Sequence, residues 1–320
     1  EKQGKAMAIW GMGILVTPVF GPTLGGVITE YSSWRWVFYI NTPICALALI
    51  LAWLAIPRTK IQKTKIDVIG ILLMFLTIGS LQLFLDQGNI KDWFDSNLIL
   101  ILAIVSSVGL ILFITWSLSY KTPAIKIHLF SNRNFRVSTL CLAIFCGTQF
   151  SMLTIEPILL QRLFGYTALE SGLTLMPMGI FSAISVGISS ILVNRIHVKY
   201  ILSIGMIFSI LGSHLLSTLT LNASQNYFVE ANAIMGFGMG FFMVPLSIYA
   251  LANIPESQVT DGAGLYSYGR MLGTSVGISL LMTLISRETL INYNHFRGHI
   301  NPVNPNLKNW LYQHHNSLSQ

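Results

Sequence analysis

Charged residues are scarce in this chain of 320 residues. Asp, Glu, Lys and Arg make up 10% of it, and hydrophobic residues make up 53%, whereas soluble domains carry about 25% charged residues. This composition excludes an ordinary soluble domain and indicates that lipid surrounds most of the chain. The net charge of +7 does not indicate nucleic-acid binding, because the basic residues are spread over short stretches between apolar runs.

Cysteine is rare as well, and the signatures of common enzymes are missing from the sequence. The three cysteines, Cys45, Cys141 and Cys146, lie in apolar runs, where a thiol behaves as a small hydrophobic side chain. No phosphate-binding glycine loop, HExxH or GxSxG motif occurs. The histidines near the C-terminus lack a metal-ligand spacing. We therefore expect no enzymatic activity, no cofactor and no metal site.

Long apolar runs recur along the chain, each of the length that crosses a bilayer. Backbone groups in hydrocarbon need partners within their own segment, so each run is predicted to be a helix. The prediction is an all-α transmembrane bundle over residues 1–286, followed by an extracytoplasmic loop or tail over the polar residues 287–320. The nine predicted spans are 7–28, 36–56, 67–86, 98–118, 137–160, 169–193, 201–221, 228–252 and 265–286.

Lysine and arginine are divided unequally between the two sets of loops. One set carries twelve of these residues and the other set carries six. Because basic loops stay on the cytoplasmic side of a membrane, the richer set is predicted to be cytoplasmic, with residue 1 on that side and 287–320 outside. The richer loops are 1–6, 57–66, 119–136, 194–200 and 253–264.

Small residues four positions apart mark the first span and two later ones. This spacing places them on one side of a helix, where another helix can approach closely in a membrane. In the first span, Pro18 and Pro22 also bend the helix, so we expect a tight but moving contact along Gly13, Thr17, Gly21 and Gly25. The same spacing predicts helix packing at Gly236, Gly240, Gly269, Gly273 and Gly277.

Three ionisable residues fall within or at the ends of predicted spans, where such groups are functional candidates. Glu156, near the outer end of its span, is a candidate for proton coupling; the alternative is a carboxylate that reaches interfacial water. Arg270 keeps its charge and is a candidate for a gating ion pair; the alternative is that it extends to the surface. Asp67 is a second ion-pair candidate, although its place at a helix start favours a capping role.

An ordered set of motifs resembles the major facilitator superfamily, and within it the fourteen-span drug:proton antiporters of the EmrB/QacA type, with the EmrB branch most similar. The Gly21-Pro22-Thr23-Leu24-Gly25-Gly26 run is similar to the antiporter motif of the fifth span, although Thr17 stands where many relatives have glycine. Further matching segments are Trp34–Pro43, Ile66–Gly70, Leu85–Gly88, Asp92–Phe94, Leu129–Phe135, Leu160–Gln161 with Gly165–Thr167, Met243–Leu246, and Arg270 with Gly273 and Gly277.

The resemblance implies a multi-pass protein of the bacterial inner membrane that exports amphipathic drugs in exchange for protons. It also implies a periplasmic adaptor and an outer-membrane channel as partners. Residue 1 would then precede the fifth span, so the chain is expected to be a fragment without the first four spans and the last. The alternatives are an exporter of a fatty acid, siderophore or other metabolite, and a nontransporting scaffold or decayed fragment.

The resemblance also directs attention to methionine and aromatic side chains that could line an adaptable drug cavity. The alternative for most of them is ordinary packing in the core or against lipid. The residues are Phe150, Met152, Met176, Phe241, Phe242 and Met243.

Overall fold

The computed structural model describes residues 13, 21–55, 67–88, 90–120, 123, 125–220 and 222–299, and these residues are predominantly helical. Residues 21–31 are helical. The further helices are α2 (Trp36–Tyr39), α3 (Asn41–Ala55), α4 (Val68–Gly88), α5 (Asn97–Ser119), α6 (Arg133–Leu163), α7 (Ala168–Leu192), α8 (Val198–Ser217), α9 (Gln225–Leu251) and α10 (Val259–His299), with short 3-10 helices η1 (Trp93–Asp95), η2 (Ile127–Ser131) and η3 (Glu256–Gln258).

Eight helices in the described part of the chain are long and apolar enough to cross a membrane, with α2 and α3 counted together over Trp36–Ala55. An all-α transmembrane bundle is thus confirmed. The predicted span 7–28 lies mostly outside the described residues. α10 continues past the predicted end of the last span at residue 286 and ends at His299. The first helix-breaking proline after residue 286 is Pro302, so the sequence contains no strong stop signal before then.

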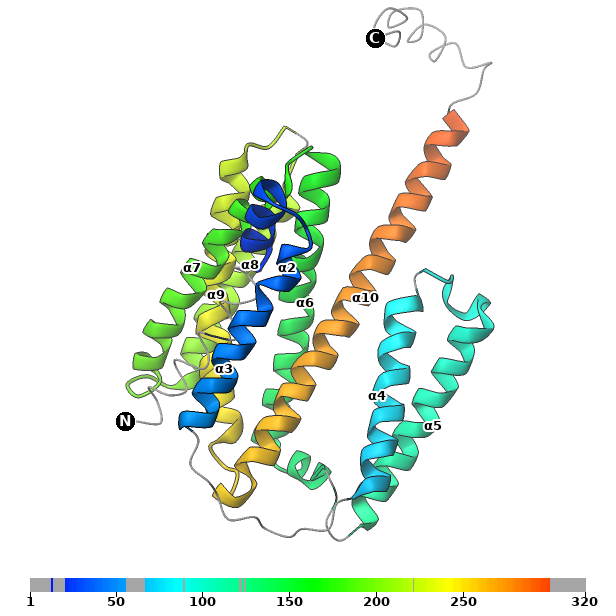
Figure 1. The fold of residues 1–320 in the computed structure, drawn as a ribbon, viewed down its shortest axis with the longest axis vertical. Helices are drawn as coiled ribbons and strands as arrows, with labels where there is room; N and C mark the ends of the chain where they lie inside the picture. Colours follow the sequence, from blue (N-terminus) through cyan, green and yellow to red (C-terminus); the bar gives the residue numbers. More distant parts are fainter. Residues whose placement is uncertain are drawn as a thin grey trace, which may run out of the picture.

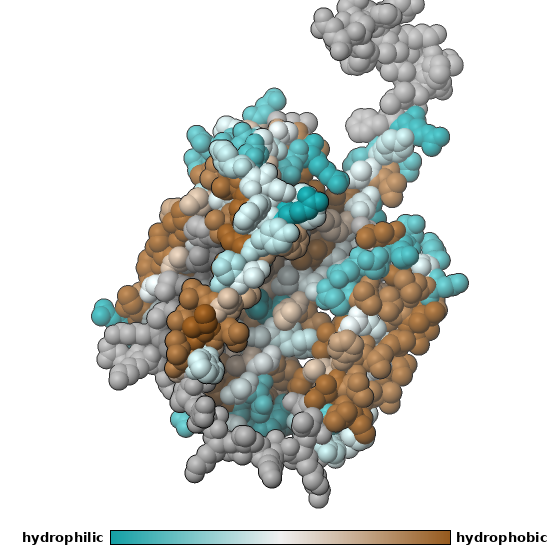
Figure 2. All heavy atoms as spheres, in the orientation of Figure 1, coloured by the Kyte–Doolittle hydropathy of each residue, from teal (hydrophilic) through white to brown (hydrophobic). Residues whose placement is uncertain are grey.

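The helices form a bundle with a separate hairpin beside it (Figure 1). α7, α8 and α9 pack together, α6 lies against α10, and α4 pairs with α5. α10 runs along the bundle and also contacts α4. The core lies around α9, whose apolar window is 72% buried, whereas that of Trp36–Ala55 has no buried residue. Exposed apolar residues cover the α4–α5 hairpin (Figure 2), as expected for helices that face lipid.

Glycines let α9 approach both of its neighbours. A Cβ added at Gly236 would fall on the carbonyl of Met178 in α7, and one at Gly240 would fall on Ser185. On another side of α9, a Cβ at Gly238 would lie 2.7 Å from the carbonyl oxygen of Gly205 in α8. Lipid is as apolar as the helices themselves, so the hydrophobic effect does not drive membrane helices together. Close backbone-to-backbone packing of this kind holds them together instead.

α10 packs on α6 through its own glycines. A Cβ at Gly273 would fall on the backbone of Ala143, and one at Gly277 would fall on the carbonyl of Gly147. Gly269, one turn before Gly273 on α10, faces the methyl group of Thr139 on α6. The five glycines singled out in the later spans therefore all lie where a neighbouring helix comes close.

Two hydrogen bonds join the α4–α5 hairpin to α10. The Ser275 hydroxyl lies 2.8 Å from Oε1 of Gln82, and the Ser279 hydroxyl donates to the carbonyl of Leu85 at 2.9 Å. Both bonds connect the middle of α10 to the later half of α4. The hairpin is thus fixed to the bundle by polar contacts at one level in the membrane.

A capping box starts α7. The Thr167 hydroxyl accepts from the Glu170 N–H at 3.1 Å, and the Glu170 carboxylate accepts from the Thr167 N–H at 2.8 Å. Replacing Thr167 by Ala removes the hydroxyl that accepts from the Glu170 N–H. We expect the free energy of unfolding to fall by about 1 kcal/mol. Unfolding of the purified protein in a mild detergent measures this; Thr29→Ala is the control, because its hydroxyl bonds only within its own helix. An unchanged stability in Thr167→Ala would contradict a stabilising cap.

Candidate functional site

A buried carboxyl lies where α6, α7 and α9 meet. Glu156 of α6 is 6% exposed, and its Oε1 accepts a hydrogen bond of 2.6 Å from Nδ2 of Asn232 in α9. The same Nδ2 lies 3.3 Å from the carbonyl oxygen of Thr174 in α7. Gln225, at the start of α9, donates to the Thr174 hydroxyl at 3.1 Å. One polar network therefore connects three membrane helices around a single acidic group.

Two oxygens of this network have unused bonding capacity. Oε2 of Glu156 and Oδ1 of Asn232 have no hydrogen-bond partner among the described residues. An ionised carboxylate can only accept hydrogen bonds, whereas a protonated carboxyl has one O–H donor and still accepts. The site can therefore change its hydrogen bonds when a proton arrives or leaves.

Prolines loosen the helices beside the network. Pro157 follows Glu156 in α6, and Pro177 lies in α7 three residues after Thr174. Each proline lacks the N–H that would bond to the carbonyl four residues earlier. The carboxyl thus lies at a weak point of its helix, where a small bend can change its surroundings.

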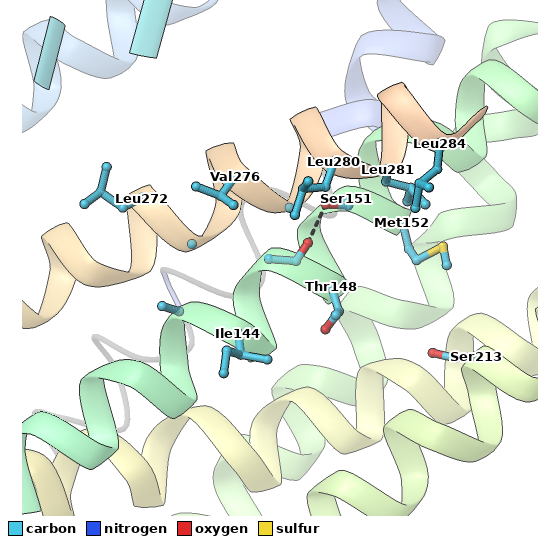
Figure 3. Close-up of a pocket in the computed structure, with 14 residues that line it drawn as sticks. Ile144, Thr148, Ser151, Met152, Ser213, Leu272, Val276, Leu280, Leu281 and Leu284 are labelled. Atoms are coloured by element: carbon cyan, nitrogen blue, oxygen red, sulfur yellow. Dashed lines mark hydrogen bonds between the residues drawn. The ribbon is translucent and has the colours of Figure 1, made fainter. Parts of the chain in front are cut away.

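An apolar cavity of about 700 Å³ lies between α6 and α10, with Ser213 contributed by α8. Figure 3 shows Leu272, Val276 and Leu280 on α10 across from α6, which contributes Thr148 and Met152. The Thr148 hydroxyl donates to its own helix at the Phe145 carbonyl, 2.9 Å away. The Ser151 hydroxyl likewise donates to the Gly147 carbonyl. These two hydroxyls are therefore not available to a bound molecule, and the wall offers mainly apolar contacts. Met152 in this wall precedes Glu156 by one helical turn.

The contact of the first helix differs from the one expected. The described atoms leave open space within 4 Å of a Cβ built at Gly13, Gly21 or Gly25. The helix instead packs on α7 one residue further round: a Cβ at Gly26 would lie 2.5 Å from the Ala168 carbonyl oxygen, and the Thr23 hydroxyl donates to the Gly172 carbonyl at 2.6 Å. The four-residue spacing identified a helix face, but the neighbouring face makes the contact. Thr17 and Pro18 lie outside the described residues, and Pro22 lies beside Gly172.

The other charged candidates have different surroundings. Asp67 is 5% exposed, and its Oδ1 accepts from the Gly70 N–H at 2.8 Å and from Trp116 Nε1 at 3.0 Å. It thereby caps α4 and ties it to α5. Arg270 forms no ion pair with a residue in the described ranges, so its gating role remains a prediction.

Most of the side chains proposed for a drug cavity lie in the core instead. Phe150, Phe241, Phe242 and Met243 are each at most 9% exposed, and the Phe242 ring stacks on Phe145. Met152 does line the cavity between α6 and α10. Sequence reasoning missed Asn232, Thr174 and Gln225. Asn232 and Thr174 are uncharged polar residues in apolar runs, and Gln225 lies in a polar stretch before its predicted span.

The described residues thus form a bundle of membrane-length helices with a buried acidic group and an apolar cavity. A model of the Major Facilitator Superfamily matches residues 1–278. The chain belongs to the major facilitator superfamily. It is a multi-pass protein of the bacterial inner membrane.

Relatives within the major facilitator superfamily are similar along nearly the whole chain. The multidrug export protein EmrB of Haemophilus influenzae is 33% identical over 317 residues, which cover 98% of this chain and 62% of the relative. EmrB of Escherichia coli is 31% identical, with 95% and 60% covered. The fatty acid resistance protein FarB of Neisseria gonorrhoeae is 31% identical, with 96% and 61% covered. The chain therefore spans about three fifths of the length of these relatives.

Proposed function

We propose that the chain belongs to a proton-driven exporter of amphipathic toxic compounds, which moves its substrates without changing them chemically. The observation that carries this proposal is the contact of the buried Glu156 carboxyl with Asn232. Ionisable groups inside membrane segments are costly and mark ion and proton pathways. The names of the EmrB relatives, which describe multidrug export, support the same class of substrate.

The cavity between α6 and α10 supports an apolar substrate. Its side chains offer few free donors, and Met152 adds a flexible, polarisable surface that accommodates different shapes. Since Met152 is one turn from Glu156, a bound compound and a bound proton would bias the same inward–outward equilibrium. Arg270 and Asp67 remain proposed for gating contacts in that equilibrium. The glycine contacts of α6 with α10 and of Gly26 with α7 would let the helices slide without separating.

Export beyond the outer membrane would need further proteins. By similarity to the EmrB branch, we propose a periplasmic adaptor and an outer-membrane channel as partners in a Gram-negative cell. Export of a fatty acid is the second candidate function, favoured by the relative named for fatty acid resistance. A nontransporting scaffold is the third and does not account for the buried carboxyl.

Transport by the full-length parent protein tests the proposal. Everted vesicles that contain it should accumulate ethidium when an acidic interior is imposed. This accumulation should stop when nigericin collapses the pH gradient. Vesicles without the protein are the control. Accumulation that continues without the gradient would contradict proton coupling, and transport of a long-chain fatty acid but not of ethidium would favour the second function.

A further inference from the structure

A second apolar cavity lies between the α4–α5 hairpin, α10 and the segment before α6. Its volume is about 440 Å³. The hydroxyls of Thr77 and Ser106 in its wall donate to their own helices, at Leu73 O (2.7 Å) and Ala103 O (3.0 Å). The cavity therefore offers hydrocarbon contacts over most of its wall. It adjoins the α6–α10 cavity at Leu272, which lines both, but its other lining residues are different, and Glu156 is not among them.

Basic side chains border one end of this cavity. Ile125 and Ile127 line it, and Lys126 between them forms an ion pair of 2.9 Å with Asp261. Asp261 precedes the lining residue Leu265 by one turn of α10. Arg136 donates through Nη1 to the carbonyl of Phe130, another lining residue, at 3.2 Å. Lys126 and Arg136 therefore place two cations at this end, which lies on the side predicted to be cytoplasmic. Two carboxylates lie at the same end, Asp261 on Lys126 and Asp67 bonded to Gly70 and Trp116.

The ion pair is accessible enough to exchange partners. The side chains of Lys126 and Asp261 are 32% and 38% exposed, and such pairs contribute little to stability. A phosphate group could therefore replace the Asp261 carboxylate on Lys126 while the hydrocarbon attached to it lies in the apolar cavity. Basic residues at the cytoplasmic surface attract anionic lipids in this way.

We propose that this cavity is a lipid-binding site that holds an acyl chain of an anionic phospholipid from the cytoplasmic leaflet, with its phosphate between Lys126 and Arg136. The lipid would fill the space between the α4–α5 hairpin and α10 nearer the cytoplasmic end than the bonds of Ser275 with Gln82 and of Ser279 with Leu85. The proposal does not depend on the transport function.

Native mass spectrometry of the purified 320-residue chain tests the site with phosphatidylglycerol and phosphatidylcholine as the probes. We expect one tightly retained phosphatidylglycerol. Ser107→Phe, which fills the cavity from α5, should lose it. Thr115→Phe makes the same kind of change at an exposed position of α5 that does not line the cavity, and it should keep the lipid. Equal retention by Ser107→Phe and the unmodified protein would overturn the proposal.

The charged rim gives a test with opposite signs. Lys126→Gln should reduce the preference for phosphatidylglycerol about fivefold, the effect of one basic residue near an anionic leaflet. Asp261→Asn frees Lys126 and should raise that preference, a gain that a misfolded protein would not show. If both variants lower the preference, the pair serves only structure and the headgroup assignment is wrong. Equal retention of the two lipids by the unmodified protein would also overturn it.

Discussion

Glu156→Gln in the full-length parent is expected to reduce proton-driven ethidium efflux to the level of cells without the transporter. The substitution keeps the size of the side chain and its hydrogen-bonding contact with Asn232 but removes the group that titrates. Binding of ethidium to the purified protein should change much less, because the apolar cavity between α6 and α10 is untouched. Efflux and binding measured across a range of external pH separate the two effects.

Glu230→Gln is the matched control for this variant. Glu230 is on α9 close to Asn232 in sequence, but its side chain is exposed, so its neutralisation should leave efflux unchanged. If Glu156→Gln pumps at the parental rate with the same pH dependence, Glu156 is not the coupling group. The coupling carboxyl would then lie elsewhere in the full-length protein.

Gly26→Leu is expected to abolish efflux by the full-length parent and to lower the melting temperature of the purified 320-residue chain, whereas Gly25→Leu should leave that melting temperature unchanged. A Cβ at position 26 would lie 2.5 Å from the carbonyl oxygen of Ala168, and backbone cannot move aside as a side chain can. At position 25 the described atoms leave open space. Efflux, membrane insertion and thermal unfolding of both variants measure the difference.

The adjacent pair makes the result specific to the contact. Both variants add the same side chain to the same helix, so a general loss of insertion would affect them alike. The opposite order, with Gly25→Leu inactive and Gly26→Leu active, would show that the four-residue stripe makes the functional contact. Gly172→Leu, on the α7 side of the same contact next to Thr23, should reproduce the loss.

The positions of the membrane helices can be predicted from the sequence, because they depend on local composition. Helices such as α5 and α7 begin and end within a few residues of the predicted spans, because a bilayer imposes both the length and the helical backbone. α10 continues beyond the predicted span end at residue 286, since polar residues end a membrane span but do not end a helix.

The sequence by itself determined that the chain is an all-α membrane protein, that its helices pack through glycine, and that Glu156 stands out as an acidic group inside a span. Only the tertiary structure decided which faces meet. Spacing places Gly21 and Gly25 on one side of a helix but cannot say that Thr23 and Gly26 contact α7. Asn232 is 76 residues from Glu156, and a contact between helices so far apart in the chain follows from packing rather than from any local pattern.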